Sequence, residues 1–175
     1  LPRLRILSFF ARWYFRCRGP PCRGARAFET GAQIQGMIQV EFDTKIAIVV
    51  ADDLATWQKL NVVSFLTSGV IGKHPGILGE PYIDGSEQQY WPLCEQPVVI
   101  LAASRERLQT FLGRARNRGL EAAIYIEDMF STGHDAANRQ TVLQYESGVL
   151  PLVGIAVRAD KKLVDKVFKG AKLHA

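Results

Sequence analysis

The chain has 175 residues, of which 47% are hydrophobic and 22% are charged, and its formal net charge is +5. These values exclude a chain too polar to fold and predict one globular domain with a sizeable core. No apolar run has the length of a membrane span, so we expect a cytoplasmic protein with no membrane partner.

The positive charge lies almost entirely in the first 36 residues. They contain seven arginines, no lysine and one acidic residue, whereas residues 37–175 contain fifteen basic and sixteen acidic side chains. Three interpretations fit this segment: an organelle transit peptide, a short signal-like region over residues 6–15, or sequence upstream of a start at Met37. We expect the third, with residues 1–36 as a basic leader that is disordered or not native, and residues 37–175 as a single α/β domain.

The domain begins with a predicted strand and helix. Residues 45–50 are rich in apolar and β-branched side chains, which is typical of a strand buried on both faces. Asp53 is placed to cap a helix that runs from Leu54 to about Ser68, where Gly69 is expected to end it. The side chains expected on the buried face of this helix are Leu54, Trp57, Leu60, Val62, Val63, Phe65 and Leu66.

The remaining elements alternate in type. Residues 70–97 are rich in glycine and proline and predict loops, with a β-hairpin that turns at Asp84-Gly85. Further strands are predicted at residues 98–102, 120–126 and 150–157, and helices at residues 105–117 and after a cap at Asp160. This order predicts an α/β fold in which helices cover both faces of a small sheet.

A polar loop follows the strand that ends at Ile126, and such loops often carry sites in α/β proteins. Its polar residues are Glu127, Asp128, Ser131, Thr132, His134, Asp135, Asn138 and Arg139. A Ser-His-Asp triad is disfavoured because the Gly-x-Ser-x-Gly turn is absent. A metal site is disfavoured because His134 has no second histidine at i+4 and the domain contains one cysteine, Cys94. We therefore expect no metal and no cofactor, and the plain alternative is a loop whose side chains cap its own backbone.

Asp52 and Asp53 follow the first predicted strand and form the second candidate site. Adjacent carboxylates shift each other's pKa and can do acid–base work where they are shielded from water. The alternative assigns Asp53 to the helix cap and leaves Asp52 in solvent. Both are candidate ligand-binding residues, together with His134, Asn138 and Arg139.

Three segments together resemble the peptidyl-tRNA hydrolase II family, and they cover most of residues 45–168. They are KIAIVVADDLATWQK, EQPVVILAASRERLQTFLGRARNRGLEAAIYIEDMFST and PLVGIAVRADKKLVDKV. The resemblance implies a small mixed four-stranded sheet with helices on both faces. Asp128 and Thr132 match the family's Asp and the Thr four residues on, and Lys59 approximates the family's lysine. The resemblance therefore implies that these three residues are catalytic.

The sequence also departs from that family. Lys59 matches the family's lysine only if one residue is deleted from the preceding turn, and QKLNVVSFLTSG replaces the signature Gly-Lys-x-x-x-Gln-x-x-His-Ala. Met129 and Phe130 stand where the family has Ala-Gly. The whole pattern, including MFSTGHDAANR, more closely resembles an uncharacterised bacterial domain-of-unknown-function family that shares the hydrolase fold.

The first hypothesis is hydrolysis of peptidyl-tRNA or a related acyl ester. Lys59 would contact a phosphate or the developing oxyanion, Asp128 would orient a water, and Thr132 would donate or relay a hydrogen bond. Binding of tRNA normally needs a concentrated positive surface, and the slight acidic excess of residues 37–175 argues against tRNA as a partner.

The second hypothesis is a non-catalytic domain of the same fold that binds a small molecule or has a regulatory role. A homodimer is a candidate assembly. Asn138 and Arg139 would hold a small anion or polar ligand, and Trp57 or Tyr90 would wall the pocket. Both hypotheses require that the carboxyl ends of the strands over residues 45–50 and 120–126 lie side by side.

Overall fold

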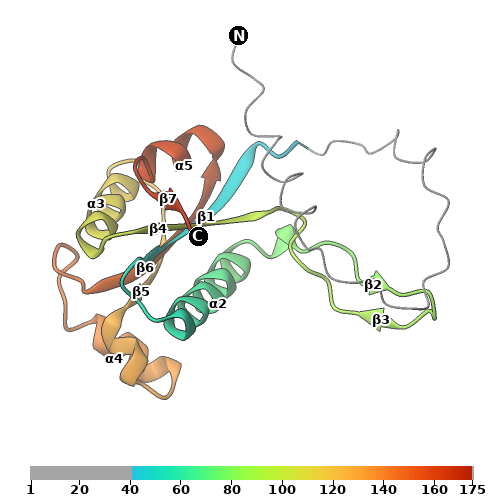
Figure 1. The fold of residues 1–175 in the computed structure, drawn as a ribbon, viewed down its shortest axis with the longest axis horizontal. Coiled ribbons are helices and arrows are strands. Elements are labelled where there is room, and N and C mark those ends of the chain that lie inside the picture. The colour runs from blue at the N-terminus through green and yellow to red at the C-terminus, as the bar shows by residue number, and fades with distance from the viewer. Residues whose placement is uncertain (1–40, 175) are drawn as a thin grey trace, which may run out of the picture. The chain divides into compact units, whose positions relative to one another are not determined.

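The computed structural model describes residues 41–174, so the predicted leader over residues 1–36 lies outside the described part. The described residues form a five-stranded sheet of order β5-β6-β1-β4-β7 and a separate hairpin, β2-β3 (Figure 1). The strands are β1 (Thr44–Ala51), β2 (Tyr82–Ile83), β3 (Gln89–Tyr90), β4 (Val98–Ala103), β5 (Ala123–Ile126), β6 (Leu152–Asp160) and β7 (Lys172–Leu173). The helices are α2 (Thr56–Lys73), α3 (Arg105–Arg116), α4 (Asp135–Val142) and α5 (Lys161–Val167), with 3-10 turns η2 (Pro75–Ile77) and η3 (Glu127–Ser131). None of the helices in this part of the chain combines the length and apolar character needed to cross a membrane.

The sheet is mixed, as predicted, but it has five strands rather than four. β1 and β4 are parallel, whereas β6 runs antiparallel to both β1 and β5. The additional strand is β7, whose two residues pair antiparallel with Leu101 and Ala102 of β4. A two-residue strand carries no readable alternation of apolar and polar residues, so the sequence pattern could not predict it.

The carboxyl ends of β1 and β5 lie at the same edge of the sheet. Both strands are antiparallel to β6, and the pairs Val50–Gly154 and Ile126–Leu152 place both ends beside the first residues of β6. The two ends therefore share one edge of the sheet, but they are not side by side as predicted, because β6 lies between β5 and β1. β4 is parallel to β1 and ends at this edge too, so the segments that follow all three strands leave the sheet together.

Helix α2 covers one face of the sheet, and its buried face differs from the predicted one. The buried side chains are Val62, Leu66 and Val70, at four-residue spacing. Trp57, Leu60 and Phe65 were predicted to be buried, and their exposed fractions are 62%, 65% and 52%. An α-helix has 3.6 residues per turn, so residues at strict three-residue spacing move progressively around the helix. They therefore cannot all lie on one buried face.

Both predicted ends of this helix are wrong as well. The N-cap is Ala55, whose backbone N–H donates to the Gln58 side chain at 3.0 Å, and Asp53 makes other contacts. The helix continues through Gly69 to Lys73. A Cβ atom on Gly69 would lie 3.2 Å from the Cβ of Ala123, so this glycine allows α2 to approach β5 closely.

Helices α3 and α5 cover the opposite face of the sheet, which confirms the prediction of helices on both faces (Figure 1). The buried residues of α3 are Leu108, Phe111, Leu112 and Ala115. Phe111 packs edge-on against Phe168 with ring centroids 5.6 Å apart, which ties α3 to the end of α5. Asp160 caps α5 as predicted, because its carboxylate accepts from the backbone N–H groups of Lys162 and Leu163.

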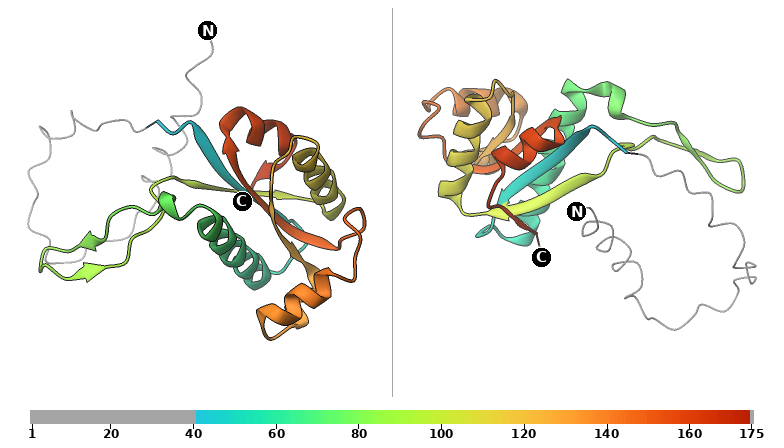
Figure 2. Two further views of the ribbon diagram at one scale, coloured as in Figure 1. Left: turned by 180° about the vertical axis from the view of Figure 1, so that it is seen from behind. Right: turned by 90° about the horizontal axis from the view of Figure 1, so that it is seen from above.

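The predicted hairpin is present and extends away from the five-stranded sheet (Figure 2). Tyr82 pairs with Tyr90, and the Asp84 carboxylate accepts from the backbone N–H groups of Ser86 and Gln88 at 2.8 and 3.0 Å. These hydrogen bonds, with a further one from the Tyr90 hydroxyl, lower the pKa of Asp84. The Asp84 carboxylate therefore holds the turn together with two backbone hydrogen bonds, from Asp84 N–H to the Gln88 carbonyl and from Glu87 N–H to the Asp84 carbonyl.

Candidate functional site

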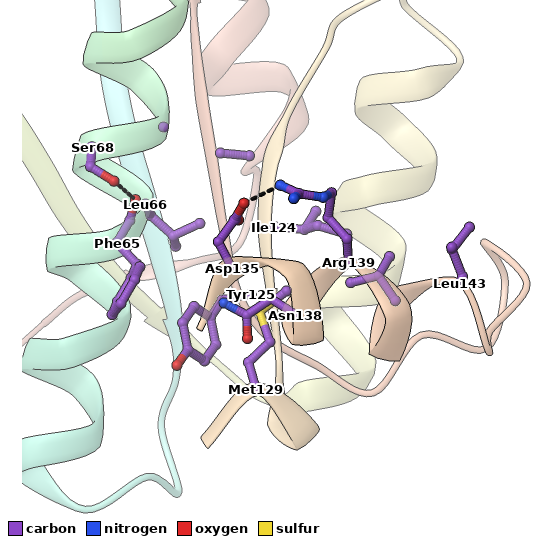
Figure 3. Close-up of a pocket in the computed structure, with 13 residues that line it drawn as sticks. Phe65, Leu66, Ser68, Ile124, Tyr125, Met129, Asp135, Asn138, Arg139 and Leu143 are labelled. Atoms are coloured by element: carbon purple, nitrogen blue, oxygen red, sulfur yellow. Dashed lines mark hydrogen bonds and ion pairs between the residues drawn. The ribbon is translucent and has the colours of Figure 1, made fainter. Parts of the chain in front are cut away.

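A cavity of about 550 Å³ lies between α2, β5 and α4 (Figure 3). Phe65 and Leu66 line it from α2, and Ile124 and Tyr125 line it from β5. The rings of Phe65 and Tyr125 pack with their centroids 5.7 Å apart, and Met129 adds a further apolar side chain. This volume lies in the range of small-molecule sites, and these two walls are apolar.

Apart from Ser68 of α2, the polar side chains at the cavity come from α4, a helix that the sequence pattern did not predict. Asp135, Asn138 and Arg139 line the cavity from this helix. His134 caps the helix, because its Nδ1 accepts from the backbone N–H of Ala137 at 3.2 Å, and it is not a lining residue. The sequence signal for α4 is Asp135 in the first turn with Arg139 four residues later, but the surrounding polar residues equally favour a loop.

Thr132 joins the segment after β5 to α4. Its hydroxyl lies within hydrogen-bonding distance of two acceptors, the Oδ1 of Asn138 and the carbonyl oxygen of Met129, the latter at 2.9 Å. A hydroxyl has one proton and donates to one acceptor at a time. The contact brings together a predicted catalytic residue and a predicted ligand-binding residue.

Asp128 contacts the segment that follows α4. Its carboxylate accepts a hydrogen bond from the Tyr145 hydroxyl at 3.0 Å, and both residues are half-buried. This hydrogen bond raises the pKa of Tyr145, because the phenolate could not donate it and would be repelled by the carboxylate. Tyr145 was missed in the sequence because it lies seventeen residues after its partner.

Lys59, the third predicted catalytic residue, is half-buried near the beginning of α2. Within residues 41–174 its ammonium group forms no ion pair. Neither Lys59 nor Asp128 lines the cavity. The structure therefore places Thr132 beside Asn138, but it links Lys59 to Asp128 by neither a hydrogen bond nor an ion pair among the described residues.

Arg105 connects the segments that follow three strands at the common edge. Its guanidinium donates to Asp53 at 2.7 Å and, through another nitrogen, to Glu127 at 2.9 Å. These hydrogen bonds, with Glu127 as the larger contributor, raise the pKa of Arg105 above its ordinary value. Asp53 is thus an ion-pair partner rather than a helix cap, and Asp52 is exposed. Within residues 41–174, no group of three His, Cys, Asp or Glu side chains could hold a metal ion.

The aromatic walls differ from those predicted. Trp57 packs edge-on against Phe130 with centroids 5.7 Å apart, and Tyr90 lies in the hairpin, so neither lines the cavity. Phe65 and Tyr125 line it instead. Sequence analysis missed them because Phe65 was assigned to the core and Tyr125 to the interior of a strand.

Comparison with known proteins gives a matching family model and similar solved structures. The family model described as "Protein of unknown function (DUF2000)" matches residues 44–175. A solved structure of a protein of unknown function from Agrobacterium tumefaciens strain C58 is similar at 51% identity, with a TM-score of 0.76, over 77% of this chain and 100% of that one. The search of curated proteins found no match.

Both comparisons agree with the predicted domain of unknown function, and neither names a peptidyl-tRNA hydrolase, so that resemblance stays a prediction. The family match covers most of the chain and includes every strand and helix described above. The chain therefore belongs to the DUF2000 family.

Proposed function

We propose that this protein binds a small molecule with an apolar body and an anionic or polar head in the cavity between α2, β5 and α4, without turning it over. The observation that carries the proposal is the make-up of this cavity of about 550 Å³, with mostly apolar side chains along α2 and β5 and three polar side chains on α4. Small-molecule sites combine a mostly apolar surface with a few polar groups that fix the orientation of the ligand.

The apolar body is expected to lie against Phe65 and Tyr125. Half of the Phe65 surface is exposed although the side chain points toward the cavity (Figure 3). The Tyr125 hydroxyl is already satisfied, since it donates to the Asn61 side chain at 3.1 Å. A ligand ring or branched chain in contact with Phe65 would remove apolar surface from water, at about 25 cal/mol per Å², whereas Tyr125 is only 5% exposed and mainly shapes the wall.

The head of the ligand is expected at Asn138 and Arg139. Arg139 pairs with Asp135 one helical turn earlier, and these side chains are 67% and 78% exposed. An ion pair that is this exposed contributes little to the stability of the fold. A ligand carboxylate can therefore replace Asp135 at the Arg139 guanidinium. The Oδ1 of Asn138 contacts Thr132, which leaves the amide N–H groups of Asn138 to donate to a ligand oxygen.

Binding is favoured over turnover by the contacts of the predicted catalytic side chains. Asp128 accepts from Tyr145, and Thr132 contacts two acceptors of its own protein. These contacts hold η3 and α4 in place, and the Thr132 hydroxyl would have to give up its present acceptor before it could donate to a substrate. Neither Asp128 nor Thr132 lines the cavity.

Replacing Arg139 with glutamine is expected to weaken binding of 4-phenylbutyrate about threefold to fivefold, as for an exposed ion pair. Binding of 4-phenylbutanol, which has the same apolar body and no charge, should be unchanged. Calorimetric titration of both probes measures the difference. Arg116→Gln is the matched control, because Arg116 is exposed on α3 and does not line the cavity. Equal weakening of the acid and the alcohol would contradict the assignment of the head group.

Hydrolysis of peptidyl-tRNA or a related acyl ester is the second candidate. It is favoured by the shared edge of β1 and β5, because α2 with Lys59 and η3 with Asp128 follow strands that end there. If this candidate is correct, the wild-type protein releases peptide from peptidyl-tRNA, and Lys59→Ala and Asp128→Asn each lower the rate about 100-fold. Asparagine keeps an acceptor for Tyr145, so this variant should fold. Lys162→Ala, an exposed position on α5, is the control, and turnover no faster than in buffer removes this candidate.

A further inference from the structure

A second cavity, of about 410 Å³, lies on the other side of the contact between Gly69 and Ala123. Both residues line both cavities, so the close approach of α2 to β5 separates them. The second cavity is formed by the end of α2, the segment before β5, and β6. Its charged side chains are Lys73, Glu121 and Arg158, and His74 lies beside them.

The cavity exists because β6 is longer than β5. The first residue of β5, Ala123, pairs with Ala156, so Arg158 lies beyond the end of its neighbouring strand. Side chains two residues apart on a strand share a face, which places Arg158 in the same row as Ala156 and Gly154. Gly154 contacts α2, so this row faces α2 and Arg158 is directed to the region near its last turn.

The charge of Arg158 is not compensated within the described part of the chain. Its guanidinium forms no ion pair with any residue from 41 to 174, and its Nε is buried without a hydrogen-bond partner. Glu121 is engaged by Lys73 at 2.6 Å, and the two side chains are largely exposed. The three charged side chains therefore leave one positive charge in excess beside a cavity.

His74 reports this positive surrounding. Its pKa is lowered first by burial and then by the positive charges of Arg158 and Lys73, and the opposing effect of Glu121 is smaller. A neutral imidazole can donate one hydrogen bond to an anion without adding charge.

We propose that this cavity is a second binding site, for a small oxyanion, either a free phosphate or the carboxylate or phosphate group of a larger small molecule. Arg158 supplies the charge and a planar set of donors that matches either oxyanion, and Lys73 adds a second cation at the mouth. His74, the residue that follows α2, also lines the cavity. The site is separate from the cavity of the proposed function, since it uses a different part of α2 and different polar residues.

Titration of the wild-type protein with inorganic phosphate, and separately with acetate, tests this proposal. The histidine ring signals are followed by NMR at constant ionic strength, with chloride as the blank. We expect a saturable shift at His74 and a higher His74 pKa when the anion is bound, because an anion stabilises the imidazolium. His134 and His174 are internal controls, and neither lines the cavity. A larger response to phosphate or to acetate identifies which oxyanion the site prefers.

Three variants complete the test. Arg158→Met keeps an apolar stem of similar length and should weaken binding of the anion at least about fivefold. Lys73→Ala changes an exposed side chain that can be lost without unfolding, and it should weaken binding by a smaller factor. Lys162→Ala on α5 should bind as the wild type does. The proposal is overturned if neither anion gives a saturable response at His74, or if the folded Lys73→Ala and Arg158→Met variants respond as the wild type does. Binding of 4-phenylbutanol, which has no anionic group, should be unchanged in all three variants, so failure here is distinguishable from failure of the proposed function.

Discussion

Replacement of Gly154 by valine is expected to lower the free energy of unfolding by about 2–3 kcal/mol, near the upper end of the usual cost of overpacking a core. Gly154 lies in β6 beneath α2, and a Cβ atom there would clash with Val62 Cγ1 and lie 2.9 Å from Leu66 Cδ1. Val62 and Leu66 are fully buried, and the β-branched Val62 has little rotamer freedom with which to move away. Helix α2 would have to shift outward from the sheet.

The matched control is Gly113→Ala in α3. A Cβ atom on Gly113 would have no neighbour within 4 Å, and alanine is favoured over glycine inside a helix. This variant is expected to raise the free energy of unfolding by about 0.5–1 kcal/mol. Urea denaturation at constant m-value measures both changes. A Gly154→Val protein as stable as the wild type would show that α2 does not pack on β6 at this distance.

Much of the fold follows from local patterns in the sequence. β1, β4 and β6 are apolar runs with β-branched residues, and α3 has its four core positions at the spacing of one helix face. The cap of α5 at Asp160 and the turn of the hairpin at Asp84 depend on hydrogen bonds within a few residues. Features that a short segment determines by itself could be predicted.

Features that depend on contacts between distant segments could not. Gly69 looks like a helix stop, but its role is set by Ala123. Asp53 looks like a helix cap, but Arg105, fifty-two residues later, takes its carboxylate. Propensity and spacing carry no information on such partners, so tertiary packing overrides the local expectation.

The candidate site was predicted in part for the same reason. Asn138 and Arg139 were identified from the polar cluster after β5, and they line the larger cavity. Phe65 and Tyr125, its aromatic walls, are indistinguishable in the sequence from ordinary core residues, because the cavity arises from where α4 lies relative to α2. The helix α4 itself was hidden among residues that also favour loops.

A side chain that fills the cavity between α2, β5 and α4 should prevent a ligand from binding there. Ser68 and Ser64 lie one turn apart on α2, both are exposed, and their hydroxyls donate to helix carbonyl oxygens at 2.7 and 2.8 Å. Ser68 lines the cavity and Ser64 does not. Tryptophan at either position adds the same bulk to the same helix, but at position 68 it would occupy the space of the ligand.

Calorimetric titration with 4-phenylbutyrate compares Ser68→Trp and Ser64→Trp with the wild type. We expect Ser68→Trp to weaken binding at least about tenfold, a loss of about 1.4 kcal/mol, and Ser64→Trp to change it less than about twofold. Equal affinities in all three proteins, or no binding by the wild type, would contradict this expectation.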